Sequence, residues 1–557
     1  MGRRALAVLV TALVVAMVTA TIPLRAAGAD EGWAGSKACA GCHREIYEKY
    51  SGVAMAHSMS PATQSASLPG AAVTILSAKF NRSFQVYRDG VDVYQSESAT
   101  DAAGKTVFRA AYKLEFAVGS GVNGYSYAVR RGNYLFEAPL SYYARLGKWE
   151  LSPGYEFGDY GFNRPLAAGC VVCHSGRPRM ARDGNGLYLD PPFQELAIGC
   201  ENCHGPGGVH VANRGAPQSI VNPARLSPRL AEQICMYCHQ GGDTRVLQPG
   251  KDYADFRPGT WLSDTLAILK VASRNSDGDL LEHHSAMQAS KCFSGSGGKL
   301  SCFTCHDPHA QPPAADAAAW YRAKCLTCHS ETSCKASQQE RAERGNDCTA
   351  CHMPKRDVTV ISHSALTNHR IIAYAGEPLR TPAAQPEGGL IYVNRPPNGG
   401  KLPRMTLWRA YGELLESEPA FQTSYLALLD ELAKDQPDNG LVQAALGTRD
   451  LRGSLADSNA TAIAHLTEAL DLGFSTSTVY ADLAEALARA GKLNEAITVL
   501  VRGVQAEPYA PELYKSLALR YITQKAYPRA KETMERYVEL FPQDDFMRGL
   551  LAKAQGR

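Results

Sequence analysis

The chain has 557 residues and 16 cysteines, and 45% of its residues are hydrophobic. This length exceeds that of one compact domain, so we expect at least two domains. The formal net charge is +3, and residues 1–29 contain three arginines and no acidic residue, which leaves no net charge on the rest of the chain. Because it has no basic stripe or basic tail, we expect no nucleic-acid partner.

Residues 1–29 have the pattern of a secretory signal peptide. Two arginines precede an apolar run from Ala5 to about Leu24, and the small-residue sequence Ala27-Gly28-Ala29 follows. We expect cleavage near Asp30 and a mature protein in the periplasm or another extracytoplasmic compartment. The apolar run is also long enough for an uncleaved membrane anchor, which stays open as an alternative.

One motif, Cys-x-x-Cys-His, occurs seven times. In c-type cytochromes its two cysteines form thioethers to one haem, and the histidine binds the iron. Structural zinc sites and disulfide frameworks also use spaced cysteines, but neither needs a histidine directly after every pair. We therefore predict seven covalent haems c, held by Cys39, Cys42, Cys170, Cys173, Cys200, Cys203, Cys235, Cys238, Cys302, Cys305, Cys325, Cys328, Cys348 and Cys351, with the proximal ligands His43, His174, His204, His239, His306, His329 and His352.

Two cysteines, Cys292 and Cys334, lie outside the motifs. In an oxidising compartment they can form a disulfide bond near the fifth and sixth haems. Two unpaired thiols are the alternative, and the sequence does not choose between them.

Eight histidines lie outside the motifs, of which His465 is interpreted as an ordinary helix residue of the C-terminal region. The other seven equal the predicted irons in number, which suggests two histidine ligands and a low potential for each haem. His283 and His284 are adjacent and point in different directions, so it stays open which of them reaches an iron. The candidate distal ligands are His57, His210, His283, His284, His309, His363 and His369.

The spacing of two candidates excludes ligation of the neighbouring haem. Residues 44–59 are predicted to form a helix, along which His57 would lie about 21 Å from His43 at 1.5 Å per residue. His309 is too close in sequence to His306 to reach the opposite face of the same porphyrin. We therefore expect each distal histidine to serve a haem of another motif, which would hold the haems close together.

Three stretches carry a family resemblance: residues 199–207 followed by His210, residues 305–309, and residues 351–354. They resemble the cytochrome c554 and hydroxylamine-oxidoreductase-like multihaem group over about residues 33–375. The resemblance implies a mostly helical, loop-rich domain with closely stacked haems and little aliphatic core, in which His57, His210 and His309 match distal ligands. The chain has no Cys-x-x-Cys-Lys motif and no recognisable tyrosine cross-link signature, and both departures weaken an assignment as an enzyme.

A β-rich insert at about residues 71–150 separates the first two motifs. Residues 84–94 alternate around Asp89-Gly90, which predicts a hairpin, and residues 112–143 predict further strands. We interpret the insert as a small sheet that covers the first haems. The alternative is that its tyrosines and Arg130, Arg131 or Arg145 line an open haem face.

Residues 376–403 are rich in proline and glycine and are interpreted as a linker between a haem domain, residues 30–375, and a helical tail, residues 404–557. Within the tail an offset of 34 residues matches Tyr480 with Tyr514, Leu483 with Leu517, Ala484 with Ala518, Ala496 with Ala530 and Pro508 with Pro542. This period resembles the tetratricopeptide repeat and predicts an α-solenoid, with two weaker copies before it. We expect its groove to bind a redox partner protein; a cap or an oligomerisation surface is the alternative.

The expected fold class is therefore mainly α: a loop-rich multihaem domain with a small β insert, followed by the solenoid. The leading functional interpretation is an electron carrier that relays electrons to a partner docked on the repeats. One alternative is a haem-dependent oxidoreductase that acts on a small nitrogen or sulfur compound at one open haem. The other is a repeat-based scaffold for a cytochrome complex.

Overall fold

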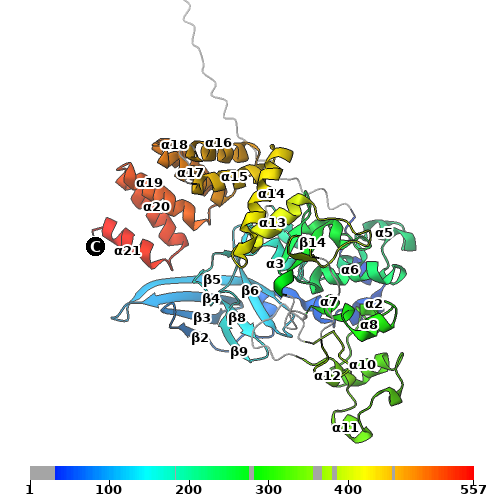
Figure 1. Cartoon of the computed structure of the whole chain (residues 1–557). Coiled ribbons are helices and arrows are strands. Elements are labelled where there is room, and N and C mark those ends of the chain that lie inside the picture. The colour runs from blue at the N-terminus through cyan, green and yellow to red at the C-terminus, as the bar shows by residue number, and fades with distance from the viewer. Residues whose placement is uncertain are drawn as a thin grey trace, which may run out of the picture.

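The computed structural model describes residues 32–181, 184–274, 282–355, 367–378, 386–453 and 458–556. Figure 1 shows three parts, an antiparallel sheet, a loop-rich central region and a row of helices. The predicted signal peptide or anchor lies outside the described residues. Within the ranges given above, no helix is both long and apolar enough to cross a bilayer.

A ten-stranded antiparallel sheet lies between the first two motifs in sequence. Its main path is β10-β7-β6-β5-β4-β3-β2, while β1 pairs with β5, and β8 pairs with both β6 and β9. Alternate side chains of β3 point into an aromatic core, as expected for strands with one buried face. The strands are β1 Met59–Pro61, β2 Val73–Ser77, β3 Arg82–Asp89, β4 Asp92–Thr100, β5 Thr106–Val118, β6 Gly124–Arg131, β7 Tyr134–Glu137, β8 Leu140–Tyr143, β9 Lys148–Leu151 and β10 Arg164–Pro165.

The predicted hairpin is confirmed, because β3 pairs with β4 and Asp89 lies opposite Asp92 across a turn in which Gly90 has a φ of 60°. The predictions of a small insert and of a mainly α domain before the linker are wrong. The sheet extends from Met59 to Pro165 and has a core of its own, with aromatic side chains from several of its strands and the loops beside them. Five of its strands have only two to four residues, too few for an alternating pattern to be visible in sequence.

The central region consists mainly of short helices and loops, together with two small sheets. β11 pairs with β12, and β14 lies between β13 and β15. Its elements are α1 Ser36–Ala40, α2 Arg44–Tyr50, α3 Ala168–Val171, β11 Gly176–Met180, β12 Tyr188–Glu195, α4 Glu201–His204, α5 Gly208–Ala212, α6 Pro228–His239, β13 Thr244–Leu247, β14 Leu266–Val271, α7 His283–Gln288, α8 Lys291–Gly295, α9 Cys302–Cys305, α10 Ala317–Cys325, α11 Gln338–Glu343, α12 Cys348–His352 and β15 Leu390–Tyr392. Short 3₁₀ helices connect them, including η1 Ala54–His57.

Two local predictions in this region are wrong. The single helix expected over residues 44–59 ends at Tyr50, and η1 resumes only at Ala54. Gly52 and the β-branched Val53 fall in the interruption, and both residue types have low helix propensity. The expected linker, residues 376–403, contains β15, whose buried Leu390 and Tyr392 pack into one core with α13 of the tail.

The tail is a row of antiparallel helix pairs, which confirms the repeat prediction. α17 and α19 begin 34 residues apart, as do α18 and α20, and four alanines at their crossings are almost fully buried. The two weaker copies correspond to α13 with α14 and to α15 with α16. The helices are α13 Arg404–Leu414, α14 Gln422–Asp435, α15 Gly440–Arg452, α16 Ser458–Asp471, α17 Ser477–Arg489, α18 Leu493–Ala506, α19 Pro511–Thr523, α20 Tyr527–Leu540 and α21 Asp545–Ala554.

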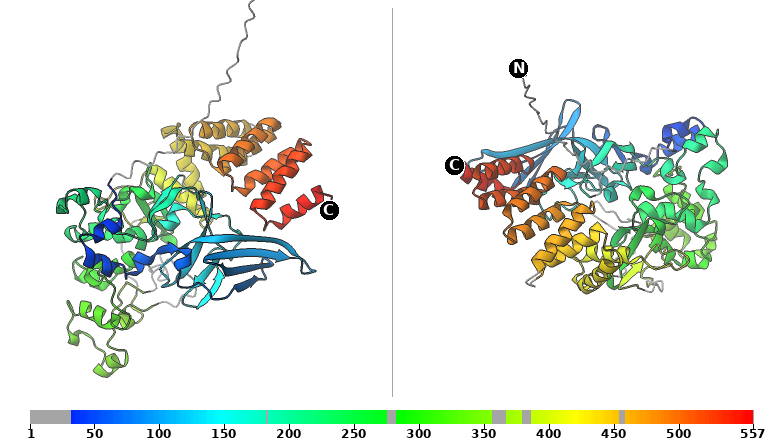
Figure 2. Two further views of the ribbon diagram at one scale, coloured as in Figure 1. Left: turned by 180° about the vertical axis from the view of Figure 1, so that it is seen from behind. Right: turned by 90° about the horizontal axis from the view of Figure 1, so that it is seen from above.

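The solenoid is attached to the rest of the molecule at both ends, and Figure 2 shows its C-terminal helices beside the sheet. At one end α13 packs on β13. Towards the other, the Tyr509 ring packs edge-on against Tyr134 and Phe136, and the Arg131 guanidinium lies 4.3 Å from the Tyr509 ring centroid. Arg131 therefore holds the solenoid on the sheet, and Arg130 pairs with Asp190. Arg131 is thus occupied by the solenoid rather than by an open haem face, while for Arg130 and Arg145 that alternative stays a prediction.

Candidate functional site

The seven Cys-x-x-Cys-His motifs lie on short helical turns of the central region, and their thiols meet in pairs. Thiols of different motifs are close enough for mutual hydrogen bonds. The pairs are Cys39 with Cys200, Cys173 with Cys238, Cys235 with Cys302, and Cys325 with Cys348. Weaker electrostatic interactions join Cys203 to Cys238, and Cys305 to Cys328. Together these interactions connect all seven motifs, with a branch at the fourth motif, which meets the second, third and fifth.

A partly buried arginine lies between the second and fourth motifs. Arg245 on β13 donates from Nη2 to the Tyr237 carbonyl at 2.6 Å and from Nη1 to the Cys173 sulfur at 3.8 Å. The hydrogen bond from Cys238 and the positive charge of Arg245 lower the pKa of Cys173 to about 6. In most of the other thiol pairs burial raises a pKa, as in Cys39, where it reaches about 12.

The structure also places motif histidines next to histidines from outside the motifs, with their ring planes nearly parallel. The rings of His43 and His210 have centroids 6.3 Å apart and planes within 13° of parallel. The His204 and His309 rings are 5.9 Å apart and within 8° of parallel. Both pairs join a proximal candidate to a distal candidate from elsewhere in the sequence.

Two further proximal histidines, His239 and His306, meet distal candidates beside the fourth and fifth motifs. The His306 and His369 centroids are 6.2 Å apart at 28°. His239 and His283 are 5.2 Å apart at 75°, and His283 also lies 4.5 Å from His369. Four proximal candidates therefore each have a distal candidate opposite or beside them.

Backbone carbonyls fix the orientation of several of these rings. The Nδ1 atoms of His204, His210 and His369 donate to the carbonyls of Val221 at 2.8 Å, Ala216 at 3.0 Å and Thr367 at 2.9 Å, respectively. The Nδ1 atom of His352 donates to Ile372 at 2.7 Å. Because Nδ1 carries the proton, Nε2 keeps its lone pair and is free to bind a metal.

Partial desolvation keeps the imidazoles neutral, which is the form that binds metals. It lowers the pKa of His204, His239, His306 and His369, and it lowers the pKa of His283 to about 3. The neighbouring imidazoles lower these values further in every case except that of His369. These rings are therefore neutral at neutral pH, with one ring nitrogen protonated and the other carrying a lone pair.

The remaining candidates do not pair in this way within the described ranges. His57 donates from Nε2 to the Ser51 carbonyl at 2.6 Å. Its neighbour Ser58 donates to the backbone carbonyl of His174 at 2.7 Å, so His57 lies near the second motif. Neither His329 nor His352 faces another imidazole in the part of the chain that the structure describes, and His363 lies outside it.

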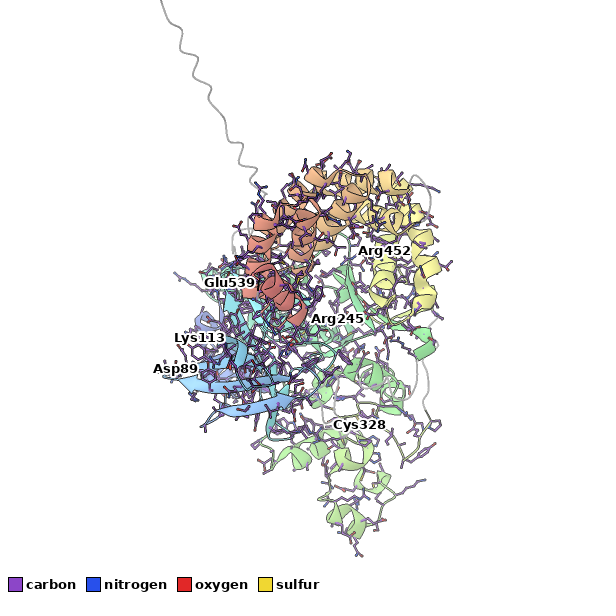
Figure 3. All side chains as sticks on the ribbon, turned by 90° about the vertical axis from the view of Figure 1, so that its left-hand side faces the viewer. Asp89, Lys113, Arg245, Cys328, Arg452 and Glu539 are labelled. Atoms are coloured by element: carbon purple, nitrogen blue, oxygen red, sulfur yellow. The ribbon has the colours of Figure 1, made fainter. Side chains whose placement is uncertain are left out.

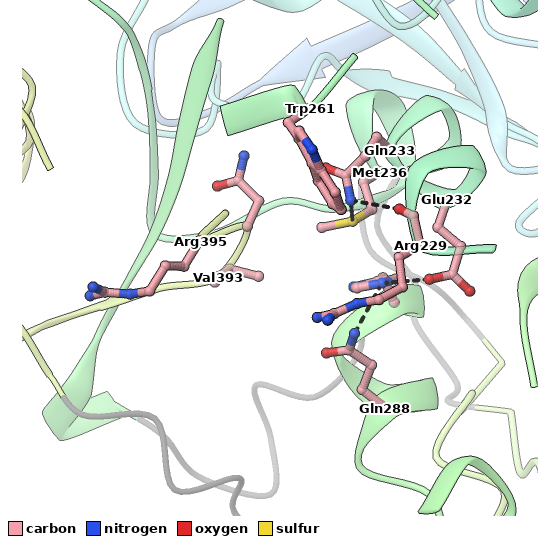
Figure 4. A pocket seen from close by; sticks show the side chains of 10 residues that line it. Arg229, Glu232, Gln233, Met236, Trp261, Gln288, Val393 and Arg395 are labelled. Carbon is pink, nitrogen blue, oxygen red and sulfur yellow. Dashed lines mark hydrogen bonds and ion pairs between the residues drawn. The ribbon is translucent and has the colours of Figure 1, made fainter. Parts of the chain in front are cut away.

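His284 is directed away from the other histidines. Its Nε2 lies 3.2 Å from Glu232 Oε2 and 3.3 Å from the Gln288 side-chain nitrogen, and it borders a cavity of about 60 Å³. Figure 4 shows this pocket, which is also lined by Arg229, Trp261 and Arg395. His465 lies in α16 and contacts Gln443 and Asp450, as expected for an ordinary helix residue.

Two glutamates that the sequence analysis missed organise the first and third motifs. The buried Glu201 carboxylate accepts hydrogen bonds from the backbone N–H groups of Ala34, Gly35 and Gly207. The Glu195 carboxylate accepts from both the backbone and the hydroxyl of Ser36. The sequence offered one signal for the role of Glu201, which is its place between the two cysteines of its motif. An acidic side chain is unexpected there if the turn is buried.

The fifth to seventh motifs belong to an exposed lobe, which we define as residues 291–355. Ser301 is its single buried residue, and Figure 3 shows Cys328 in this lobe, on the opposite side of the molecule from Glu539 of the solenoid. The two cysteines outside the motifs, Cys292 and Cys334, are both free thiols. Burial raises the pKa of Cys292, and the thiol that raises it further by its proximity is that of Cys328, not that of Cys334. Among the described residues, no three His, Cys, Asp or Glu side chains are grouped so that they could hold a metal ion by themselves.

No family model and no curated protein matches the chain. Solved tetratricopeptide-repeat structures do match part of it. The MamA protein is 20% identical over 28% of this chain and 83% of its own, with a TM-score of 0.24. A thermophilic tetratricopeptide-repeat protein of Thermus thermophilus is 16% identical over 28% and 82%, with a TM-score of 0.24. A tetratricopeptide-repeat domain from Arabidopsis is 16% identical over 21% and 94%, with a TM-score of 0.19. The multihaem resemblance stays a prediction.

Proposed function

We propose that this protein is an extracytoplasmic electron carrier with seven covalent haems c. Each motif would attach one haem through two thioethers and supply a histidine to the iron. The haems would supply the redox chemistry, while the chain's own residues bind them, orient them and set their spacing. The observation that carries this proposal is that four motif histidines each lie opposite or beside a histidine from outside the motifs.

The distances between these imidazoles fit an iron between them. A ring nitrogen lies about 2.0–2.1 Å from a bound first-row metal and the ring centroid about 1.1 Å further away, so two rings on opposite sides of one iron have centroids about 6.2 Å apart. The pairs at 6.3, 5.9 and 6.2 Å match this span. The fourth pair, at 5.2 Å, would open by about 1 Å to reach the same span.

The connected thiols support a continuous electron route. Because every motif has a thiol within interaction range of another motif, the attached haems would form one connected set that branches at the fourth motif. Electron tunnelling slows steeply with distance, so a connected set conducts where isolated haems would not. The exposed lobe at one end of the set gives electrons access to a second protein.

The attachment of the solenoid at both ends supports the proposal that a redox partner docks on the repeats. Because α13 packs on β13 at one end and Tyr509 packs on the sheet towards the other, a partner bound to the repeats would keep a fixed position relative to the haems. A solenoid joined to the rest of the chain only by a flexible linker would not hold the partner in a fixed position. The solenoid would then set which protein exchanges electrons with the chain.

Protein purified from its native host should have a mass that exceeds its polypeptide by seven haems. Replacing both cysteines of the fifth motif, Cys302→Ala with Cys305→Ala, should remove one haem, because a single thioether pair holds each group. Cys292→Ala is the matched control and should keep all seven, since Cys292 lies outside the motifs. A colourless protein with the mass of its amino acids alone would contradict the proposed function.

His210→Met should raise the midpoint potential of one haem. Exchanging one imidazole for a thioether destabilises ferric iron and raises the potential. The shift would be measured by a redox titration followed in the visible spectrum, with His465→Met in the solenoid as the control that leaves all potentials unchanged. If His210→Met left every potential unchanged, His210 would not be a ligand opposite His43.

A further inference from the structure

Two side chains of opposite charge lie among the motif thiols, and neither forms an ion pair within the ranges that the structure describes. Glu201 lies between the two cysteines of the third motif and is 4% exposed. Arg245 on β13 reaches the fourth motif, where its Nη2 atom donates to the Tyr237 carbonyl at 2.6 Å. A charge that is held away from water acts strongly on its surroundings, because little solvent screens it.

Backbone groups alone hold the Glu201 carboxylate. It accepts hydrogen bonds from the N–H groups of Ala34 and Gly35, both at 2.8 Å, and from that of Gly207 at 2.7 Å. A backbone N–H group is a neutral donor, so these contacts orient the carboxylate and satisfy its oxygens but leave its negative charge in place. The first motif and the third motif therefore share one uncompensated negative charge.

A second carboxylate lies at the same place. Glu195 accepts from the Ser36 backbone N–H at 2.8 Å and from the Ser36 hydroxyl at 2.9 Å, and Ser36 is the first residue of α1, the helix of the first motif. Both Glu195 and Glu201 act electrostatically on the Cys39 thiol of that motif. The negative charge thus lies beside the sulfur to which a haem would be attached.

Two arginines of this area are directed to an aromatic ring and not to these carboxylates. The guanidiniums of Arg177 and Arg257 lie 4.3 and 5.7 Å from the centroid of the Trp33 ring. Among the described residues neither of them forms an ion pair with Glu195 or Glu201. The negative charge beside the first and third motifs is therefore not neutralised by direct contact.

The opposite situation exists between the second and fourth motifs. The Nη1 atom of Arg245 lies 3.8 Å from the Cys173 sulfur, and its Nε atom is buried without a hydrogen-bond partner in the described part of the chain. Its charge also acts on Cys238. Once these cysteines are thioethers their sulfurs carry no charge, so no group of the motifs compensates the guanidinium.

These two charges should have opposite effects on the haems beside them. Adding an electron to a ferric haem makes its site more negative, so a nearby carboxylate opposes reduction and a nearby guanidinium favours it. The propionates of the haems do not create this difference, because every haem has two of them. The difference comes from the residues of this chain.

We propose that Glu201, with Glu195 beside it, lowers the reduction potential of the haems of the first and third motifs, and that Arg245 raises the potential of the haems of the second and fourth, so that electrons pass from the first pair to the second. This inference rests on the proposed function, because it requires the haems. The crossing point is the place where Cys203 of the third motif meets Cys238 of the fourth. The fourth motif, at which the connected set branches, would then receive the electrons.

A redox titration of the holoprotein, followed in the visible spectrum, tests this proposal. Glu201→Gln should raise the potential of one or two haems, and Arg245→Met should lower the potential of one or two. We expect each shift to be about tenfold in the equilibrium constant of reduction, which is about 59 mV for one electron. Shifts of the same sign in the two variants would overturn the proposal, and an unchanged titration in either variant would overturn the role of that residue.

Haem content is measured in parallel and separates the two levels of the argument. A protein without haem would contradict the proposed function, whereas seven haems with unchanged potentials in both variants would overturn this inference alone. If Glu201→Gln loses a haem, Glu195→Gln replaces it in the test, because it leaves the three hydrogen bonds of Glu201 intact. Glu195→Gln should raise the same potentials, and no rise would overturn the role of the negative charge.

A surface carboxylate and a conservative variant provide the matched controls. Glu48 on α2 pairs with Arg44, and its side chain is 61% exposed, so Glu48→Gln should leave every potential unchanged. Arg245→Lys keeps the positive charge and should keep the potentials of the unmodified protein. If Arg245→Lys lowered them as much as Arg245→Met, the hydrogen bonds of Arg245 and not its charge would set the potential, and the proposal would be wrong.

Discussion

Protein made without haem attachment should lose the structure of the lobe, residues 291–355, and keep the sheet and the solenoid. The lobe has only one buried residue, Ser301, so its polypeptide forms no fully buried apolar core, and its phenylalanines and leucines are only partly buried. Ordering a residue costs about 1–2 kcal/mol of backbone conformational entropy, and a stretch of this length cannot offset that cost without a core. The haems of three motifs are the apolar groups that could supply this core.

The sheet and the solenoid differ from the lobe in this respect. The sheet buries Phe84, Tyr127, Phe136 and other large side chains, and the solenoid has an extended core of its own. At about 25 cal/mol per Å² of buried apolar surface, these parts gain most of their stability from the polypeptide alone. Loss of haem should therefore act on one part of the molecule and spare the others.

Limited proteolysis of the holoprotein and of protein from a host without haem-attachment enzymes would measure this difference. We expect the haem-free protein to be cut at least about tenfold faster within the lobe, because proteases act on locally unfolded chain. Cleavage within α17–α20 should proceed at the same rate in both preparations. Equal cleavage rates in the lobe would show that its polypeptide is stable without a haem core.

The features that could be predicted from the sequence are those with a short, strict spacing. The Cys-x-x-Cys-His motifs are visible in five residues, and the offset of 34 residues locates α17 to α20 because each repeat preserves its small residues at the helix crossings. The hairpin at Asp89-Gly90 was visible for the same reason, since the turn and both strands are contiguous. In each case the signal is local.

Features that depend on distant contacts were not visible. The short strands β1 and β10 form because their backbones pair with the edges of β5 and β7, respectively. Nothing in the residues of β1 and β10 themselves indicates this pairing. The position of His284 is set by Glu232, 52 residues earlier in the chain. Two adjacent histidines look equivalent in a sequence, and only the three-dimensional neighbours separate them.

Arg82→Met should destabilise the joint between the sheet and the solenoid by about 3–5 kcal/mol, the usual cost of removing one partner from a buried ion pair. The Nε atom of Arg82 lies 3.3 Å from Glu97 Oε1 and 3.2 Å from Asp159 Oδ2. Its Nη2 atom donates to the Gln543 carbonyl at 2.8 Å and contacts Asp545 at the start of α21. Without Arg82, Glu97 and Asp159 would be buried with no positive charge between them.

The loss in the free energy of unfolding would be measured by urea denaturation. It equals the shift in the midpoint of the transition that reports on the sheet and α21, multiplied by the slope of that transition. Arg404→Met is the matched control: Arg404 pairs with Glu431 and Asp435 at the surface, so its loss should cost at most about 1 kcal/mol. Adding Glu97→Gln to Arg82→Met should recover part of the loss. Equal midpoints for Arg82→Met and Arg404→Met would contradict the role of Arg82.

The cost of Arg82→Met should also depend on pH. Burial, followed by the nearby Asp159 carboxylate, raises the pKa of Glu97 far above its ordinary value, while Arg82 lowers it. The folded state therefore binds more protons than the unfolded state, and stability falls as pH rises from the ordinary carboxyl pKa through the raised one. Without Arg82 the Glu97 pKa rises further, so the loss of stability should be smallest in mild acid and grow towards alkaline pH. A loss independent of pH would mean that Arg82 acts through packing against Phe108 rather than through its charge.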